Sequence, residues 1–186
     1  MLRLVIVFLH IASAMGIVAS FVIESLVLVQ LRAARGAADA RTVLANFRHS
    51  QRAGGGSLLL TVVTGIYLAT AYWKWNGAWM GLGFLTLVAI AVVGATMTGL
   101  PVTRFLRANS SAGSTLPSGL VGRLKMSFAI RMALFFGIVF LMTVKPAAAV
   151  PALTTIGIAA VLGVAFGLMS SRRSTTVPNA PTATAR

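Results

Sequence analysis

Three ionisable residues lie within long apolar runs of the sequence: His10, Glu24 and Arg131. Such side chains are costly inside a membrane and often mark an ion or proton path. His10, Ser13, Ser20 and Glu24 follow one another at near-helical spacing, so we expect them on one face of a single helix. Pointing into a helix bundle, this face either lines an ion or proton path or joins helices by hydrogen bonds and close packing.

The depths of Glu24 and Arg131 predict an ion pair between two helices. Glu24 lies seven residues before Leu31, the expected end of the first apolar run, so it is about 10 Å deep at 1.5 Å per residue. Arg131 lies six residues after Lys125, which places it at about 9 Å. Opposite charges at one depth offset part of the cost of burying them. The alternative is that Arg131 reaches lipid phosphates and Glu24 is protonated.

The histidines and two methionines are the candidates for binding a metal or haem. A haem with two histidine ligands needs both at one depth, whereas His10 and His49 are expected on opposite faces of the membrane. His10 with Met80 and Met142 would be a softer donor set that suits Cu(I), although methionine is also a common apolar filler. We expect no cofactor, and these three residues are the minor metal candidates.

Groups for catalysis are few. The only acidic side chains are Glu24 and Asp39, and cysteine is absent. General acid–base chemistry needs partners within hydrogen-bond reach, and no phosphate-binding glycine motif occurs. We therefore expect a protein that is not an enzyme.

The elements that carry these residues follow from composition. Hydrophobic residues make up 58% of the chain and charged residues 10%, and the apolar residues form blocks long enough to cross a bilayer as helices. The prediction is an all-α polytopic bundle in residues 1–170, with five spans at about 4–31, 54–72, 79–102, 126–144 and 147–169. Gly77 and Gly81, and likewise Gly163 and Gly167, have the spacing of close helix contacts, within the chain or with another copy.

Polar connectors separate the spans. Residues 32–53 have a helical apolar face (Ala33, Ala37, Ala40, Leu44 and Phe47) that either extends the first span or lies on the membrane surface. Gly54 to Gly56 open the second span, and tryptophans at 73, 75 and 79 predict an interfacial turn. Residues 103–125 form a second connector, Pro146 and Pro151 mark a tight turn, and 171–186 are expected to be a disordered tail. The first residues imitate a signal peptide, but the apolar run continues past its cleavage site.

The basic residues predict the orientation. One set of connectors and the tail hold Arg32, Arg35, Arg41, Arg48, Arg52, Arg104, Arg107, Arg123, Lys125, Arg172, Arg173 and Arg186, and the opposite side holds Arg3, Lys74 and Lys145. The positive-inside rule places the first set in the cytoplasm and the N-terminus outside. The net charge of +14 therefore favours contact with anionic lipids over nucleic acid.

Three short stretches resemble a family of uncharacterised small bacterial integral membrane proteins. They are FLHIASAMG, TGIYLA and RMALFFGIVFLMTVKP. The resemblance covers roughly residues 4–150 and implies a five-span inner-membrane protein. His10 is also distantly similar to the early histidine of CopD-type copper resistance proteins and of haem-biosynthesis membrane proteins, whose further histidine and methionine pattern is missing here.

Our leading functional hypothesis is a non-enzymatic inner-membrane protein that transports a small solute or ion, because Glu24 lies within a span. The first alternative is a structural or accessory subunit, or a homodimer, that packs through its glycine faces. The second is copper or haem handling through His10.

Overall fold

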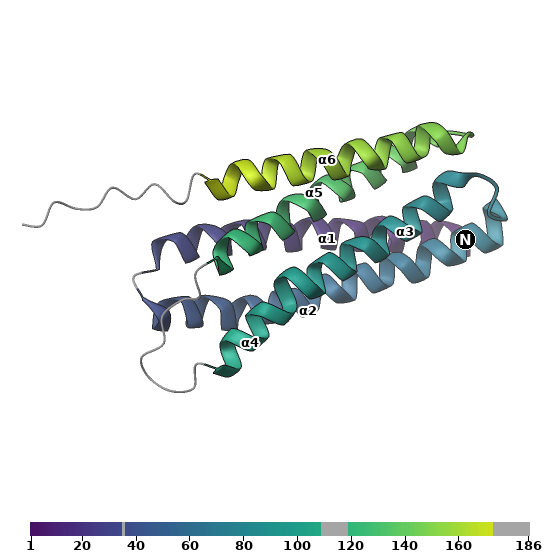
Figure 1. The fold of residues 1–186 in the computed structure, drawn as a ribbon. Helices are drawn as coiled ribbons and strands as arrows, with labels where there is room; N and C mark the ends of the chain where they lie inside the picture. The colour runs from purple at the N-terminus through teal and green to yellow at the C-terminus, as the bar shows by residue number, and fades with distance from the viewer. Residues whose placement is uncertain (35, 109–118, 173–186) are drawn as a thin grey trace, which may run out of the picture.

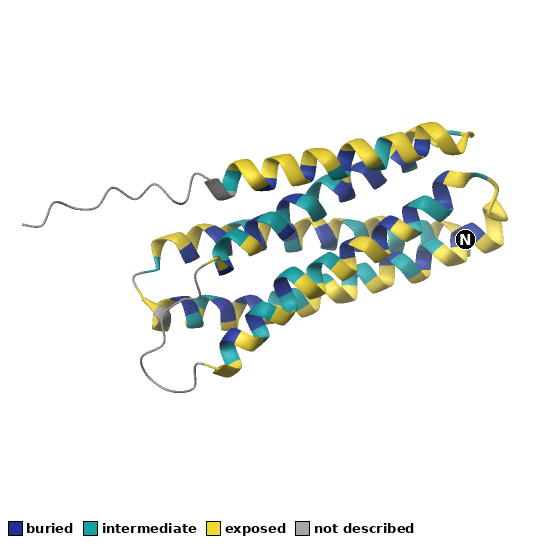
Figure 2. Ribbon diagram, viewed as in Figure 1, coloured by how far each residue is buried: buried dark blue, intermediate teal, exposed yellow. Residues whose placement is uncertain are grey.

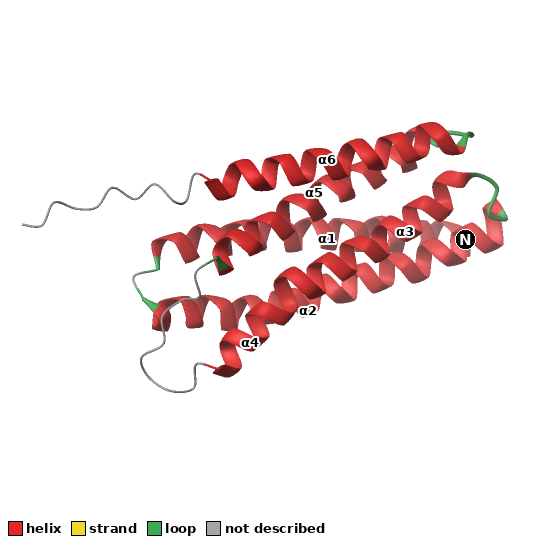
Figure 3. Cartoon of the chain, in the orientation of Figure 1, coloured by secondary structure: helices red, strands yellow, loops and turns green. Residues whose placement is uncertain are grey.

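The structure is a computed structural model that describes residues 1–34, 36–108 and 119–172. All regular structure in these residues is helical (Figure 3). The elements, with η for a π-helical turn, are α1 (Leu2–Ala33), α2 (Ala37–Leu68), η1 (Ala69–Trp73), α3 (Ala78–Val93), η2 (Gly94–Gly99), α4 (Leu100–Ala108), α5 (Leu120–Val144) and α6 (Ala149–Arg172). Five of the described helical segments are long and apolar enough to cross a membrane, which confirms the predicted fold class.

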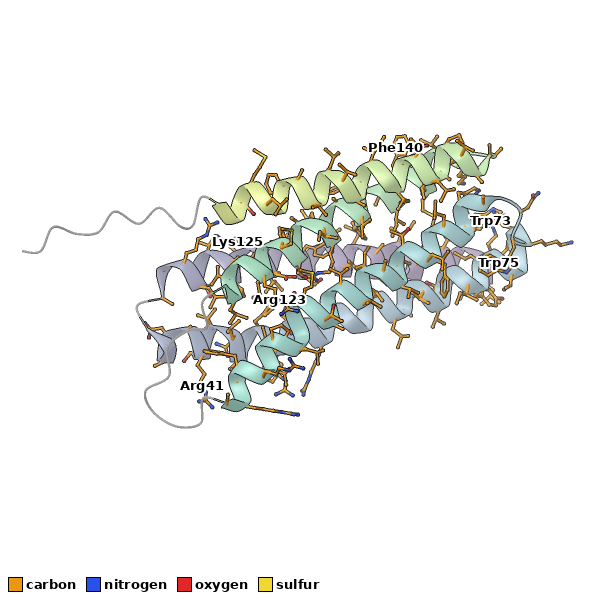
Figure 4. All side chains as sticks on the ribbon, in the orientation of Figure 1. Arg41, Trp73, Trp75, Arg123, Lys125 and Phe140 are labelled. Carbon is orange, nitrogen blue, oxygen red and sulfur yellow. The ribbon has the colours of Figure 1, made fainter. Side chains whose placement is uncertain are left out.

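Successive segments run antiparallel along one axis (Figure 1). The helix α1 packs mainly along α2, and α6 packs mainly along α5, while the continuous run from α3 through η2 contacts α5. One end of the bundle carries Arg41, Arg123 and Lys125, and we call it the basic end. The opposite end carries Trp73 and Trp75, and we call it the tryptophan end (Figure 4).

The outward faces of the helices are apolar. Figure 2 shows exposed residues along the outside of every helix, and they include large side chains such as Phe8, Leu26 and Phe166. A surface of this kind is stable in lipid and unfavourable in water. The arrangement of the bundle therefore supports the membrane assignment independently of segment length.

The first connector differs from the prediction. Residues 37–53 are the first turns of α2, so they extend the second span and not the first. Ala40, Leu44 and Phe47 are buried against α1, α4 and α5, while Ala33 is exposed. The helix continues through Gly54, where α2 packs closely on α1. An added Cβ there would lie 2.8 Å from Ser20 Cβ, so this glycine permits a helix contact.

The other helix ends also shift. The third span runs on to Ala108, α5 begins at Leu120 and not at 126, and α6 begins at Ala149 and not at 147. Pro101, which has no N–H to donate, lies inside this third span two residues after the wider π-helical turn η2. The middle of the second connector, 109–118, and most of the predicted tail, 173–186, lie outside the described residues.

Candidate functional site

Glu24 of α1 and Arg131 of α5 form an ion pair inside the bundle, as their predicted depths indicated. The Arg131 Nη2 group donates to Glu24 Oε1. Both side chains are shielded, with 4% of the Glu24 side chain and 11% of the Arg131 side chain exposed. A charge pair this far from water needs further hydrogen bonds to offset its desolvation.

Hydroxyl groups of α5 itself and of the neighbouring η2 supply those bonds. Arg131 Nε donates to Ser127 Oγ at 3.2 Å, and Nη2 lies 3.4 Å from Thr98 Oγ1. Thr98 in turn donates to Ser127 at 2.8 Å. Gly94 of η2 permits this approach, because an added Cβ there would lie 3.3 Å from Arg131 Cδ. The pair is therefore held at a fixed place between α1, η2 and α5.

A cavity of about 320 Å³ lies beside the ion pair, which we call the inner cavity. Glu24, Arg131 and Ser20 line it together with small residues of α2 and η2, among them Gly54 and Gly94. Small residues leave open volume between helices that larger side chains would fill. The buried carboxylate and guanidinium thus border a space large enough for a small solute.

A second cavity of about 290 Å³ lies at the tryptophan end, which we call the outer cavity. His10, Met80 and Met142 all line it, so the three minor metal candidates do come together around one space. Lys145 lines the same cavity. An ammonium group opposes the binding of a metal cation, so the residues present fit a copper ion poorly.

Hydrogen bonds hold α1 to α2 beside the outer cavity, which His10 and Thr61 line. The Thr61 hydroxyl donates to Ser13 Oγ at 2.8 Å, and Ser13 donates to the His10 carbonyl oxygen at 2.9 Å. His10 Nδ1 lies 3.0 Å from Thr64 Oγ1. The face with His10, Ser13 and Ser20 thus points into the bundle, where at least His10 and Ser13 have structural partners.

An apolar cluster separates the cavities, and we call it the barrier. It consists of Ile17, Phe21, Leu87, Ile90, Leu134, Phe135 and Ile138, which come from α1, α3 and α5. Ile90 borders the inner cavity and Leu87 borders the outer one. None of the residues that the structure describes lines both cavities. The bundle therefore holds two spaces in series, one toward each end, with packed apolar side chains between them.

The two glycine motifs behave differently. Gly163 and Gly167 pack against α5 of the same chain: an added Cβ at Gly163 would lie 2.9 Å from Ile130 Cα, and one at Gly167 would clash with Met126. The other motif does not form a helix contact within the chain, and contact with another copy stays a prediction. Gly77 lies in the turn before α3 with φ of 128°, and Gly81 has no neighbour within 4 Å of an added Cβ.

The two histidines lie in different parts of the bundle. His10 contacts Thr64, whereas His49 lies fifteen residues earlier on the same helix α2, about 22 Å along its axis. They cannot share one haem iron within a chain. Among residues 1–34, 36–108 and 119–172, no three histidine or acidic side chains gather in a way that could hold a metal.

Several partners in these sites were missed from the sequence. Thr61 and Thr64 hold Ser13 and His10, and Thr98 and Ser127 hold Arg131. A signal existed for the first two residues, because Ser57, Thr61 and Thr64 recur at helical spacing in an apolar run. Thr98 and Ser127 carry no such pattern, and only the packing of η2 on α5 reveals them.

Comparison of the chain with protein-family models, with curated proteins and with solved structures finds no match. The resemblance based on three short stretches stays a prediction.

Proposed function

We propose that this protein is a bacterial inner-membrane carrier for a small solute or ion, with its N-terminus outside and its C-terminus in the cytoplasm. The orientation rests on the charge difference between the two ends, since most of the arginines and lysines lie toward one end and the tryptophans lie at the other (Figure 4). With this orientation the inner cavity belongs to the cytoplasmic half and the outer cavity to the external half. Anionic lipid headgroups would surround the basic end.

One observation carries the proposal: two cavities lie in series along the bundle, and a packed apolar cluster lies between them. A carrier needs a binding space that opens to one side while the other side stays closed. Binding sites in membrane carriers also lie between helices with irregular turns. Here the π-helical turn η2 forms part of the inner cavity wall.

The Glu24–Arg131 pair is the polar group with which the solute would interact. A solute that carries an anionic or a cationic group competes for one member of the pair and releases the other. Movement of Arg131 would also disturb Thr98 and the turn η2, because Thr98 bonds to Arg131. This links occupancy of the inner cavity to the shape of the third span. Glu24 lines this cavity, while Asp39, the other acidic side chain, lies in the first turn of α2. The two carboxyl groups therefore lie apart, which supports a carrier over an enzyme that uses paired acids and bases.

Water access to the two cavities tests the proposal. The chain has no cysteine, so single cysteines are clean probes for an aqueous, membrane-impermeant thiol reagent. Ser20→Cys in the inner cavity should react from the cytoplasmic side, and Val62→Cys in the outer cavity should react from the outside.

Matched positions on the lipid face serve as controls. Val22 and Val63 lie next to the tested positions on the same helices and are 54% and 56% exposed toward the outside of the bundle. Cysteines there should stay unlabelled, because lipid excludes the reagent. If Ser20→Cys and Val62→Cys also stay unlabelled from both sides, the cavities are dry and the protein is a structural subunit.

A further inference from the structure

The outer cavity contains a cation and aromatic rings but no carboxylate. Lys145 Nζ lies 5.4 Å from the centre of the Trp73 ring and 5.9 Å from that of Trp79. Both acidic side chains of the protein lie elsewhere, since Glu24 lines the inner cavity and Asp39 is in the first turn of α2. The lysine therefore has no acidic partner in its cavity.

The surroundings of the outer cavity add to this positive charge. Arg3 stacks on Tyr72 with its guanidinium carbon 5.4 Å from the ring centre, and Lys74 lies in the same turn as Trp73 and Trp75. Cations gathered around a cleft raise the local concentration of anions there. The field at the cavity thus favours an anion and opposes a cation.

The residues that line the outer cavity determine which kind of ligand fits it. Trp79 and Met80 are buried on the inner side, with 6% and 5% of their surface exposed, while Lys145 and Trp75 are exposed. Apolar walls with a few polar groups are typical of small-molecule sites, and the volume of about 290 Å³ lies at the small end of their usual range.

We propose that the outer cavity binds a small organic anion with an apolar body, whose negative group pairs with Lys145 and whose body lies against Trp73 and Trp79. This goes beyond the proposed carrier function, because binding here is measurable without transport. The anion has two sources: a free organic acid or the headgroup region of an anionic lipid.

Tryptophan fluorescence tests the proposal directly, because all three tryptophans of the protein line this one cavity. The protein is placed in nanodiscs of zwitterionic lipid and titrated with cyclohexanecarboxylate, cyclohexanecarboxamide and cyclohexylmethylammonium. These probes share one apolar body and differ in charge. We expect a saturable spectral change with the carboxylate, weaker binding of the amide and the weakest binding of the ammonium compound.

Two lysine variants make the test specific. Lys145→Gln should weaken binding of the carboxylate roughly tenfold, the factor of one hydrogen bond to a charged group. Lys145→Arg should preserve it. Lys74→Gln is the matched control, because Lys74 lies at the same end of the bundle, in the turn before α3, but does not line the cavity. It should weaken carboxylate binding much less than Lys145→Gln does, because Lys74 acts on the anion only through its long-range charge.

The results distinguish a free organic acid from a lipid as the bound anion, and they show when the proposal is wrong. If nanodiscs with phosphatidylglycerol suppress carboxylate binding, a lipid is the resident anion; if they do not, a free acid is. The proposal is wrong if the carboxylate and the amide bind equally, if the ammonium compound binds best, or if no saturable change occurs. Identical carboxylate affinity of Lys145→Gln and Lys74→Gln would also overturn it. Labelling of Ser20→Cys from the cytoplasmic side reports on the inner cavity and does not depend on any of these results, so the carrier function is tested separately.

Discussion

Glu24 and Arg131 lie 107 positions apart in the sequence and meet as a buried ion pair that joins α1 to α5. Each side chain is largely shielded from solvent, and neither has a second partner of opposite charge among the described residues. Removing one member therefore leaves the other charged and unpaired in an apolar surrounding.

The first prediction follows from that pairing. Glu24→Gln and Arg131→Gln should each lower the free energy of unfolding in detergent by about 3 kcal/mol, as for other buried pairs that lose one partner. The double variant should lose less than the sum of the two single losses. Thermal unfolding followed by circular dichroism measures all four proteins.

Arg123→Gln is the control for the loss of one positive charge, because Arg123 is exposed on the same helix. Its effect should stay within about 0.5 kcal/mol, as for ordinary surface changes. Strictly additive losses for Glu24 and Arg131 would contradict a stabilising pair.

The second prediction concerns the contact of α6 with α5. Gly163→Ala should destabilise the protein by about 1–3 kcal/mol, the usual cost of overpacking, because its Cβ would lie 2.9 Å from Ile130 Cα. Gly157→Ala on the same helix is the control, since an added Cβ there meets nothing within 4 Å. Equal midpoints of thermal unfolding for the two variants would show that α6 does not pack at Gly163.

The third prediction concerns the turn between the second and third spans. Gly77 has φ of 128° and lies against the indole of Trp79, so Gly77→Ala should cost about 1–2 kcal/mol in backbone strain. Gly81→Ala should be neutral, because that glycine faces open space. Thermal unfolding of the two variants distinguishes a turn glycine from a helix-packing motif, and a larger loss at Gly81 would restore the motif interpretation.

How far the sequence predicts this structure depends on the range of the interactions. Uninterrupted apolar runs predict the spans, because the cost of exposing a backbone to lipid depends only on local sequence. The Glu24–Arg131 pair follows from depth, since each charge lies within an otherwise apolar run. The α2 extension was assigned wrongly, because Gly54 to Gly56 are common helix breakers and their contact with Ser20 is not local.

The cavities could not be predicted from the sequence. They result from small residues on three different helices that face one another, such as Ser20, Gly54 and Gly94 around the inner cavity. Which small residues meet depends on helix rotation and on the π-helical turn η2. His10, Met80 and Met142 were proposed as a group from depth alone, but Lys145, which changes their chemistry, was not connected with them.

The fourth prediction tests the orientation in the membrane. Asn76→Cys in the tryptophan-end turn should react with an impermeant thiol reagent added to intact cells, because that turn is expected outside. Thr42→Cys, exposed near the start of α2, should react only after the cells are opened. The reverse labelling pattern would invert the topology and exchange the sides on which the two cavities open.

The most direct test of the central claim is a proton leak through an opened barrier. Leu87→Ser together with Ile90→Ser would place hydroxyl groups between the cavities, whereas Val88→Ser together with Val92→Ser changes exposed positions of the same helix. Proteoliposomes with a pH-sensitive dye inside are given a potassium diffusion potential, and internal acidification is recorded. We expect the unchanged protein and the Val88/Val92 variant to be impermeable to protons, and the Leu87/Ile90 variant to let protons through. A folded Leu87/Ile90 variant that is as tight as the control would show that the two cavities are not ends of one path.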